Sequence, residues 1–303
     1  MNLSVGIGKL KLKNPVMAAS GTWGFEYGEL ADIDRLGAVV LKTITLKKRV
    51  GNPPPRIYET ASGMLNSIGL ENGGLDDMIE NKLPKLDGAG TRVIVSIAGD
   101  TKDDFKKLAA RLSKCRRVDA LELNLSCPNV VHGVDEGLFA HSEKAVYGIV
   151  KAVREATPLT VITKLSPNVT DVKIFAAAAE AGGSDAIALC NTFIGMAIDA
   201  ETMRPRLGNI IGGLSGPAIK PLSLRAVWEA AKAVDIPIVG IGGIMGWRDA
   251  VEFMLSGAAA VQVGTANFVD PRSPAEIVRG LEKYLSKHKI GDVRKLVGAI
   301  KLG

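Results

Sequence analysis

Eight short apolar runs alternate with helix-like segments along the 303-residue chain. The runs are residues 16–20, 38–45, 92–99, 120–127, 160–166, 186–192, 237–243 and 260–266. Between them lie segments such as 103–115, 142–156 and 171–182, where apolar residues recur with helical spacing. Apolar strands that alternate with helices are typical of a parallel sheet covered by helices. Eight such units predict an α/β fold, a (β/α)8 TIM barrel, as one domain over residues 1–303.

Two connections are too long to be simple turns. Residues 46–91 follow the second strand and contain "GNPPPR" and "NSIGLENGG", and residues 193–220 follow the sixth strand. Both insertions leave the carboxyl end of a strand, where TIM barrels build their active sites. Long loops in compact domains are usually functional. We therefore expect both insertions to contribute to a site.

The composition narrows the class of protein. Aromatic residues make up only 5% of the chain while glycine occurs 34 times, which suits a tightly packed enzyme better than a nucleic-acid platform. Cysteines stand at 115, 127 and 190 with no paired spacing, which favours a reducing cytoplasm and cannot supply the four thiolates of an iron–sulfur cluster. The net charge of +6 is spread along the chain, and no apolar run is long enough to span a membrane. We expect a cytoplasmic protein with no nucleic-acid, membrane or metal partner.

Two lysines interrupt apolar strands. Lys42 lies in the second strand and Lys164 in the fifth, and a charge in such a position is costly unless it meets an anion or a strong acceptor. The alternative is a long side chain that extends to solvent. Because both lysines lie near strand ends, we expect them to face a ligand.

Glycines cluster after the seventh strand and in the eighth. The stretch "GIGGIMG" places glycines at 240, 242, 243 and 246, and "VGTA" follows. TIM barrels often bind phosphate with the loops after strands seven and eight. The spacing does not fit the dinucleotide fingerprint G-x-G-x-x-G, so a single phosphate, as in FMN, fits better than a dinucleotide.

Five motifs together point to a family. "LNLSCPNV", "GNPPPRI", "NSIGL", "GGLSGPAIKP" and "GIGGI" resemble the dihydroorotate dehydrogenases, and within them the catalytic subunits of class 1B, along essentially the whole chain. The resemblance implies a barrel that holds FMN and oxidises dihydroorotate to orotate in pyrimidine (UMP) biosynthesis. Cys127 matches the catalytic base of class 1. Asn129 separates the chain from related dihydropyrimidine dehydrogenases, whose motif is similar to "NLSCPH".

The resemblance also implies individual contacts. Lys42 is expected to serve catalysis beside Cys127. The expected FMN contacts are Ser20, Lys42, Thr43, Asn124, Lys164, Gly216, Gly242, Gly243, Gly264 and Thr265. The expected orotate contacts are Lys42, Asn66, Ser67, Ile68, Gly69, Leu70, Asn124, Asn191 and Thr192. The chain departs from the family pattern at Ser96, where Asn is expected, at Glu71 and Gly73 of "LENGG", and at Cys190, to which we assign a packing role.

The expected chemistry fits these residue types. Dihydroorotate loses a proton from C5 and a hydride from C6, and a flavin can accept the hydride. A thiol that its site tunes toward neutral pH can take the proton. Lys164 would offset negative charge on the reduced flavin. Residues 130–137 resemble a lid over this base, and we interpret His132 within them as an exposed loop residue.

The class 1B resemblance implies a route for the electrons. It predicts a second subunit with FAD and a 2Fe–2S cluster that passes electrons to NAD⁺, and a homodimer of catalytic subunits within a heterotetramer. A fumarate-linked class 1A enzyme is the first alternative. Dihydropyrimidine dehydrogenases and dihydrouridine synthases are related FMN barrels, and a non-redox phosphate-binding barrel is the alternative from another class.

Overall fold

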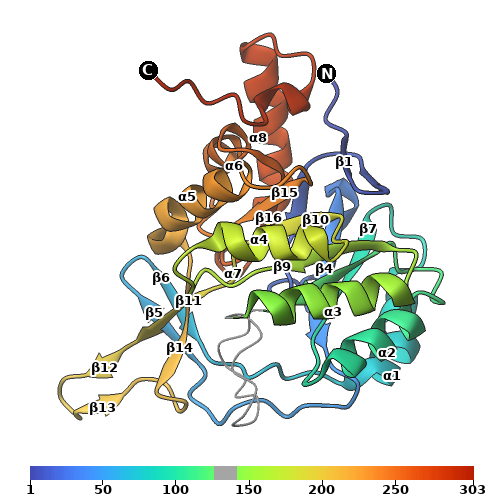
Figure 1. Cartoon of the computed structure of the whole chain (residues 1–303). Helices are drawn as coiled ribbons and strands as arrows, with labels where there is room; N and C mark the ends of the chain where they lie inside the picture. Colours follow the sequence, from blue (N-terminus) through green and yellow to red (C-terminus); the bar gives the residue numbers. More distant parts are fainter. Residues whose placement is uncertain (126–141) are drawn as a thin grey trace.

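Eight parallel strands close into a barrel, as the alternating runs predict. The computed structural model describes residues 1–125 and 142–303, and the strands follow one another around the barrel in the order β10-β15-β16-β3-β4-β7-β8-β9 (Figure 1). Their bounds are β3 Val16–Ala18, β4 Ala38–Ile44, β7 Arg92–Ile97, β8 Ala120–Asn124, β9 Thr160–Lys164, β10 Ala186–Leu189, β15 Ile238–Ile241 and β16 Ala258–Val263. Each strand overlaps one predicted run, so the predicted TIM barrel is confirmed.

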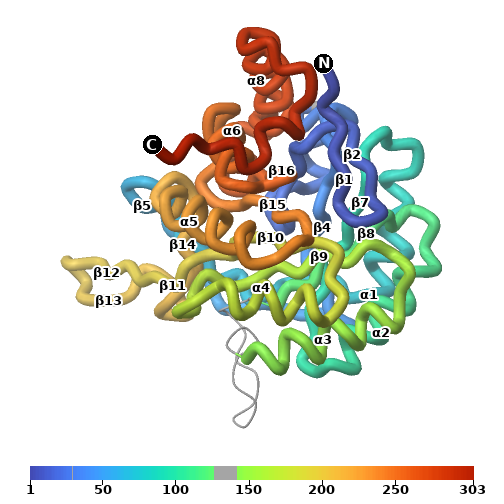
Figure 2. The backbone as a smooth tube through the Cα atoms, turned by 45° about the horizontal axis from the view of Figure 1, so that its top comes forward, coloured from blue at the N-terminus to red at the C-terminus, as the bar shows by residue number. Residues whose placement is uncertain are grey.

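Helices pack around the outside of the barrel. The longer ones are α2 Lys102–Leu112, α3 Glu143–Ala156, α4 Val172–Ala181, α5 Lys220–Ala230, α6 Trp247–Leu255 and α8 Ser273–Lys287, and α1 Gly74–Asp77 and α7 Ala266–Val269 are short. Helix α2 begins with a capping box, because Thr101 Oγ1 accepts from the Asp104 amide at 3.2 Å and Asp104 accepts from the Thr101 amide at 3.0 Å. Helices α2, α3 and α4 lie side by side along one flank (Figure 2).

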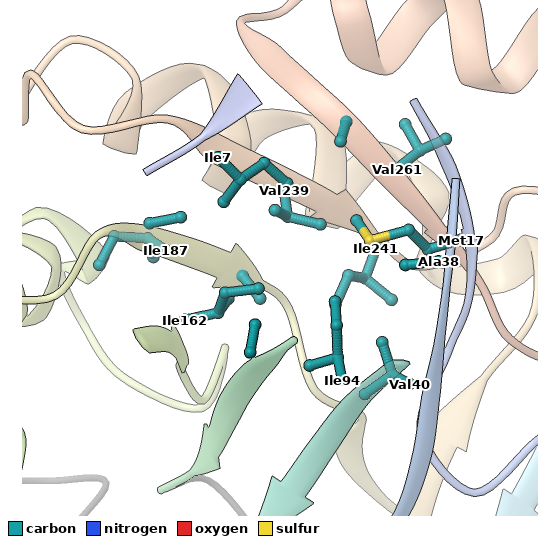
Figure 3. Packing of buried hydrophobic residues seen from close by; sticks show 14 of the residues in the cluster. Ile7, Met17, Ala38, Val40, Ile94, Ile162, Ile187, Val239, Ile241 and Val261 are labelled. Atoms are coloured by element: carbon teal, nitrogen blue, oxygen red, sulfur yellow. The ribbon is translucent and has the colours of Figure 1, made fainter. Parts of the chain in front are cut away.

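Shorter elements complete the chain. A hairpin of β1 Val5–Ile7 and β2 Leu10–Leu12 precedes the barrel, and the short helical turns are η1 Phe25–Ala31, η2 Ile33–Arg35, η3 Met78–Lys82, η4 Leu83–Leu86, η6 Pro217–Ile219 and η7 Val293–Leu296. Ile7 of the hairpin is fully buried beside Val239 (Figure 3).

Apolar side chains fill the barrel, so it is a packed core and not a pore. Met17, Val40, Ile94 and Ile241 come from different strands and pack together, and all four are buried (Figure 3). Their packing leaves the carboxyl ends of the strands for polar chemistry.

The two insertions meet in one antiparallel sheet. The first supplies β5 Ile57–Thr60 and β6 Gly63–Asn66, the second supplies β11 Phe193–Met196 and β14 Ile211–Ser215, and the strand order is β11-β14-β6-β5 (Figure 1). A further hairpin, β12 Ile198–Asp199 and β13 Arg204–Pro205, extends from it. Register pairs Asn66 with Gly213, which brings the end of the first insertion against the second.

Candidate functional site

A cavity of about 360 Å³ lies at the carboxyl ends of the barrel strands. It is lined by all ten predicted FMN contacts, namely Ser20, Lys42, Thr43, Asn124, Lys164, Gly216, Gly242, Gly243, Gly264 and Thr265. The predicted orotate contacts Asn66, Ile68, Gly69, Leu70, Asn191 and Thr192 also line it. The structure therefore brings together residues that are up to 245 positions apart, such as Ser20 and Thr265.

Two predicted residues are not among the described residues that line the cavity. Ser67 is fully buried and does not line the cavity, and its hydroxyl has no hydrogen-bond partner in the part of the chain that the structure describes. Cys127 lies outside the described residues, as do Asn129, His132 and the rest of the segment 130–137. The roles of Ser67 and Cys127, like those of the other predicted site residues, stay predictions.

A hydroxyl network orients one wall of the cavity. Thr43 Oγ1 lies 3.2 Å from Ser20 Oγ and 2.9 Å from Ser96 Oγ, and it accepts from Asn124 Nδ2 at 3.3 Å. Ser20 Oγ also donates to the Leu41 carbonyl at 2.9 Å. Ser96 is fully buried and does not line the cavity. The serine at this departure from the family pattern thus supports Thr43 from behind.

Lys164 is held inside the barrel. Lys164 is only 7% exposed, so its side chain does not extend to solvent, which was the alternative to facing a ligand. Its Nζ lies 3.8 Å from Oε1 of Glu122, which is fully buried. A cation at a cavity wall is suited to an anionic or electron-rich ligand.

The sixth barrel strand ends in a group of amides. Asn191 Nδ2 donates to Asn124 Oδ1 at 3.3 Å, and the Asn191 Oδ1 accepts from the Thr192 amide at 2.8 Å. Asn168 Nδ2 donates to the Thr192 carbonyl at 3.0 Å, and Asn168 Oδ1 accepts from the Ile194 amide at 3.0 Å. Asn168 was not among the predicted residues. The signal that could have identified Asn168 is its position just after the predicted strand 160–166.

Glycines form a cradle in another part of the cavity wall. Gly216, Gly242 and Gly243 have positive φ values of 95°, 120° and 74°, a region that favours glycine. A Cβ on Gly242 would lie 2.3 Å from Ser223 Oγ, and one on Gly243 would lie 2.7 Å from Lys220 Cβ. The close packing of α5 therefore excludes side chains here. The bare backbone is suited to the close approach of phosphate oxygens.

The "GNPPPR" segment, residues 51–56, holds the stretch 66–70 in place through hydrogen bonds. Asn52 Nδ2 donates to the Ser67 carbonyl at 3.0 Å, and the Asn52 amide donates to the Ile68 carbonyl at 3.1 Å. Glu71 pairs with Arg56 at 2.6 Å, so this departure from the family pattern ties the two segments together. Gly73 has an ordinary φ of −77°, but a Cβ there would lie 2.6 Å from Cγ and 2.8 Å from Cβ of Asp77, so the Asp77 side chain leaves no room for one.

Cys190 is a buried thiol in the cavity wall. Its Sγ lies 3.2 Å from Ser223 Oγ. Burial raises the pKa of Cys190 to about 11. A thiol with this pKa stays protonated near neutral pH, which agrees with the packing role expected for it.

Sequence reasoning missed two polar residues below the cavity. Glu122 and Gln262 are both fully buried, and Gln262 Nε2 donates to Glu122 Oε2 at 2.6 Å. Alternation along a strand was the missed signal, since Glu122 precedes Asn124 by two positions and must share its face.

The described residues contain no group of three His, Cys, Asp or Glu side chains placed to hold a metal ion. Within residues 1–125 and 142–303, no helix has both the length and the apolar character needed to cross a membrane.

Known proteins match the chain along its whole length. The family described as Dihydroorotate dehydrogenase matches residues 2–285. A relative from Thermoanaerobacter sp. (strain X514), named "Dihydroorotate dehydrogenase B (NAD(+)), catalytic subunit", is 50% identical over 100% of both chains. A relative of the same name from Geobacter metallireducens is 52% identical over 99% of both chains. The crystal structure of DHODH in complex with ferulenol from Eimeria tenella superposes with a TM-score of 0.80 at 26% identity, covering 98% of this chain and 88% of that one. The chain belongs to the dihydroorotate dehydrogenase family.

Proposed function

We propose that this chain oxidises dihydroorotate to orotate in pyrimidine biosynthesis, as the catalytic subunit of an NAD-linked enzyme. One observation carries the proposal: a single cavity joins the buried Lys164, the amides of Asn124 and Asn191, and the glycine cradle of Gly242 and Gly243. Curated relatives that match the full chain carry the name of an NAD⁺-linked catalytic subunit, which supports the assignment.

FMN is the cofactor that these residues would hold. The glycine cradle, together with Gly264 and Thr265, leaves room and donors for one phosphate. Lys164, Asn124 and Thr43 would face the flavin ring, which requires donors for its carbonyl groups. When bound, FMN supplies the acceptor for the hydride from C6.

Dihydroorotate would bind between the barrel and the insertion sheet. The amide side chains of Asn66, Asn124 and Asn191 suit a planar ring with amide edges. Lys42 would pair with the substrate carboxylate, because a carboxylate binds most strongly to a charged donor. Residues 68–70 and Thr192, which line the cavity, would complete the pocket.

Cys127 is the proposed base that takes the C5 proton. Strand β8 ends at Asn124, and Cys127 comes three positions later in the sequence. Cys190, a thiol that lines the cavity, is unsuited to this role because burial raises its pKa to about 11. The raised pKa of Cys190 therefore favours Cys127 over Cys190 as the base.

A second subunit would remove the electrons. The phrase "catalytic subunit" in the relatives' names implies a partner chain. We propose that this partner carries FAD and a 2Fe–2S cluster and passes electrons to NAD⁺, with two catalytic subunits in a heterotetramer. The three cysteines of this chain are too few to ligate the cluster alone.

Steady-state turnover of the isolated chain tests the proposal. With FMN and dihydroorotate present, the chain should reduce an artificial dye efficiently and NAD⁺ poorly. No dye reduction by an FMN-loaded chain would overturn dihydroorotate oxidation. Efficient turnover with fumarate and no partner would instead overturn the two-subunit assignment and favour the class 1A alternative.

A further inference from the structure

We propose that Glu122 is a positioning residue for Lys164: its buried carboxylate holds the lysine ammonium at the cavity wall and offsets part of its charge. Through Lys164, Glu122 would set how strongly the cavity favours a reduced flavin. This inference rests on the proposed binding of FMN beside Lys164.

The barrel register places Glu122 directly beneath the cavity. Glu122 and Asn124 lie two positions apart on β8, so their side chains share the inner face. Asn124 pairs in register with Lys164 on β9. Gln262 lies two positions before Gly264, which lines the cavity. Glu122 and Gln262 therefore form the layer below the one that the ligand would touch.

The contacts in this layer hold the carboxylate in place. Gln262 Nε2 donates to Glu122 Oε2 at 2.6 Å, while Glu122 Oε1 lies 3.8 Å from Lys164 Nζ. The longer distance makes an ion pair but no direct hydrogen bond. In the residues that the structure describes, Oε1 accepts no hydrogen bond from protein. Lys164 thus keeps its N–H donors for the cavity while its charge is balanced from below.

Because Glu122 is buried, its charge acts strongly on Lys164. Its side chain is 0% exposed and that of Lys164 is 9% exposed, so solvent and salt screen the pair weakly. A fully buried carboxylate is costly unless a cation pairs with it, and Lys164 provides that cation. The reduced flavin carries more negative charge than the oxidised form. Lys164 favours reduction, and Glu122 opposes it.

The test measures the equilibrium for two-electron reduction of bound FMN against a reference dye, without dihydroorotate. Glu122→Gln keeps the shape of the side chain and removes its charge. It should shift the equilibrium at least tenfold toward reduced flavin, which is about 30 mV for two electrons. Thr163→Val is the control: Thr163 precedes Lys164 on β9, is fully buried, and its hydroxyl bonds to Ser184 rather than to Glu122. It should shift the equilibrium less than threefold because it removes no charge.

The same substitution in a Lys164→Met variant shows whether Glu122 acts through Lys164. Lys164→Met removes the cation that lies 3.8 Å from Glu122 Oε1, and with it the path from Glu122 to the flavin. Adding Glu122→Gln to that variant should therefore shift the equilibrium less than threefold. A tenfold shift in both backgrounds would contradict action through Lys164. If Glu122→Gln does not fold, Glu122→Leu provides the second charge-free variant.

The experiments separate a failure of the proposed function from a failure of the role of Glu122. If the wild-type chain binds no FMN, the proposed function fails. If the wild-type chain binds FMN and the folded charge-free variants leave the reduction equilibrium within threefold, the role of Glu122 is overturned while the proposed function stands.

Discussion

The side-chain amide of Asn191 donates a hydrogen bond to Oδ1 of Asn124 over 3.3 Å. Asn124 ends β8 and Asn191 follows β10, so the bond passes over the end of β9, which lies between these strands. It leaves Nδ2 of Asn124 to donate to Thr43 at 3.3 Å. The donors of the cavity are therefore oriented by one another before a ligand binds. Such preorganisation lowers the cost of ordering the site around a ligand.

Replacing Cys127 should separate flavin binding from chemistry. In Cys127→Ala, flavin reduction by dihydroorotate should slow by about 10²–10⁴, because general-base catalysis contributes that much, while FMN stays bound. Cys127→Ser should retain some rate at high pH, since a hydroxyl is a poorer base. Anaerobic stopped-flow spectroscopy measures both rates. Near-wild-type reduction in the alanine variant would rule Cys127 out as the base.

Removing Lys42 should weaken orotate binding. A hydrogen bond to a charged group contributes about 1.5–3 kcal/mol, so Lys42→Ala should bind orotate roughly 10–100-fold more weakly and also slow flavin reduction. Orotate titration of the FMN-loaded chain measures the affinity. Lys107→Ala is the control, because Lys107 is 61% exposed on α2 and pairs with Asp103. Equal affinities for the two variants would show that Lys42 does not face the ligand.

Alanine at Gly243 should damage the glycine cradle. Gly243 has a φ of 74°, and a Cβ there would meet Lys220 Cβ at 2.7 Å and its backbone nitrogen at 2.9 Å. The left-handed conformation alone costs an alanine about 1–2 kcal/mol. We expect Gly243→Ala to lose stability and to retain less FMN after gel filtration. Gly246→Ala, in the same loop with open space and a φ of −155°, should retain wild-type FMN. Full FMN occupancy in Gly243→Ala would contradict the cradle.

The buried thiol of Cys190 should make stability fall in alkali. Burial raises its pKa from 9.0 to about 11. The stabilising effect of the neutral thiol is complete below pH 9 and is lost as the pH rises toward 11, because the unfolded chain releases this proton first. Two pKa units correspond to about 3 kcal/mol. Urea unfolding at pH 8 and pH 11 should show a smaller loss in Cys190→Ser than in the wild type. Identical losses would contradict the assigned pKa.

The sequence predicted the barrel well because its signals are local. Runs such as 92–99 and 160–166 are apolar on both faces, and helical segments such as 142–156 separate them. Pairing between the insertions could not be predicted in this way. Asn66 and Gly213 are 147 positions apart, and no local pattern in either strand specifies the other. The single domain over residues 1–303 stays a prediction.

The candidate site was predictable where polar residues follow apolar strands, as at Asn124 and Asn191. Supporting residues were harder to predict, because Asn52 and Asn168 act through backbone groups of distant segments. Glu122 was missed although it alternates with leucines in the strand that ends at Asn124, because only polar residues at the ends of strands were assigned to the site. Asn124 lines the cavity, and a residue two positions before it on the strand must point to the same side, so Glu122 also points inward.

Anaerobic addition of dihydroorotate to the FMN-loaded chain tests the central claim most directly. If the cavity oxidises dihydroorotate, the visible absorbance of the oxidised flavin should bleach within the mixing time of a manual experiment. One equivalent of orotate should form per flavin reduced, and Cys127→Ala should slow the bleaching. A chain that binds FMN in a folded state and whose flavin spectrum stays oxidised after excess dihydroorotate would contradict the account.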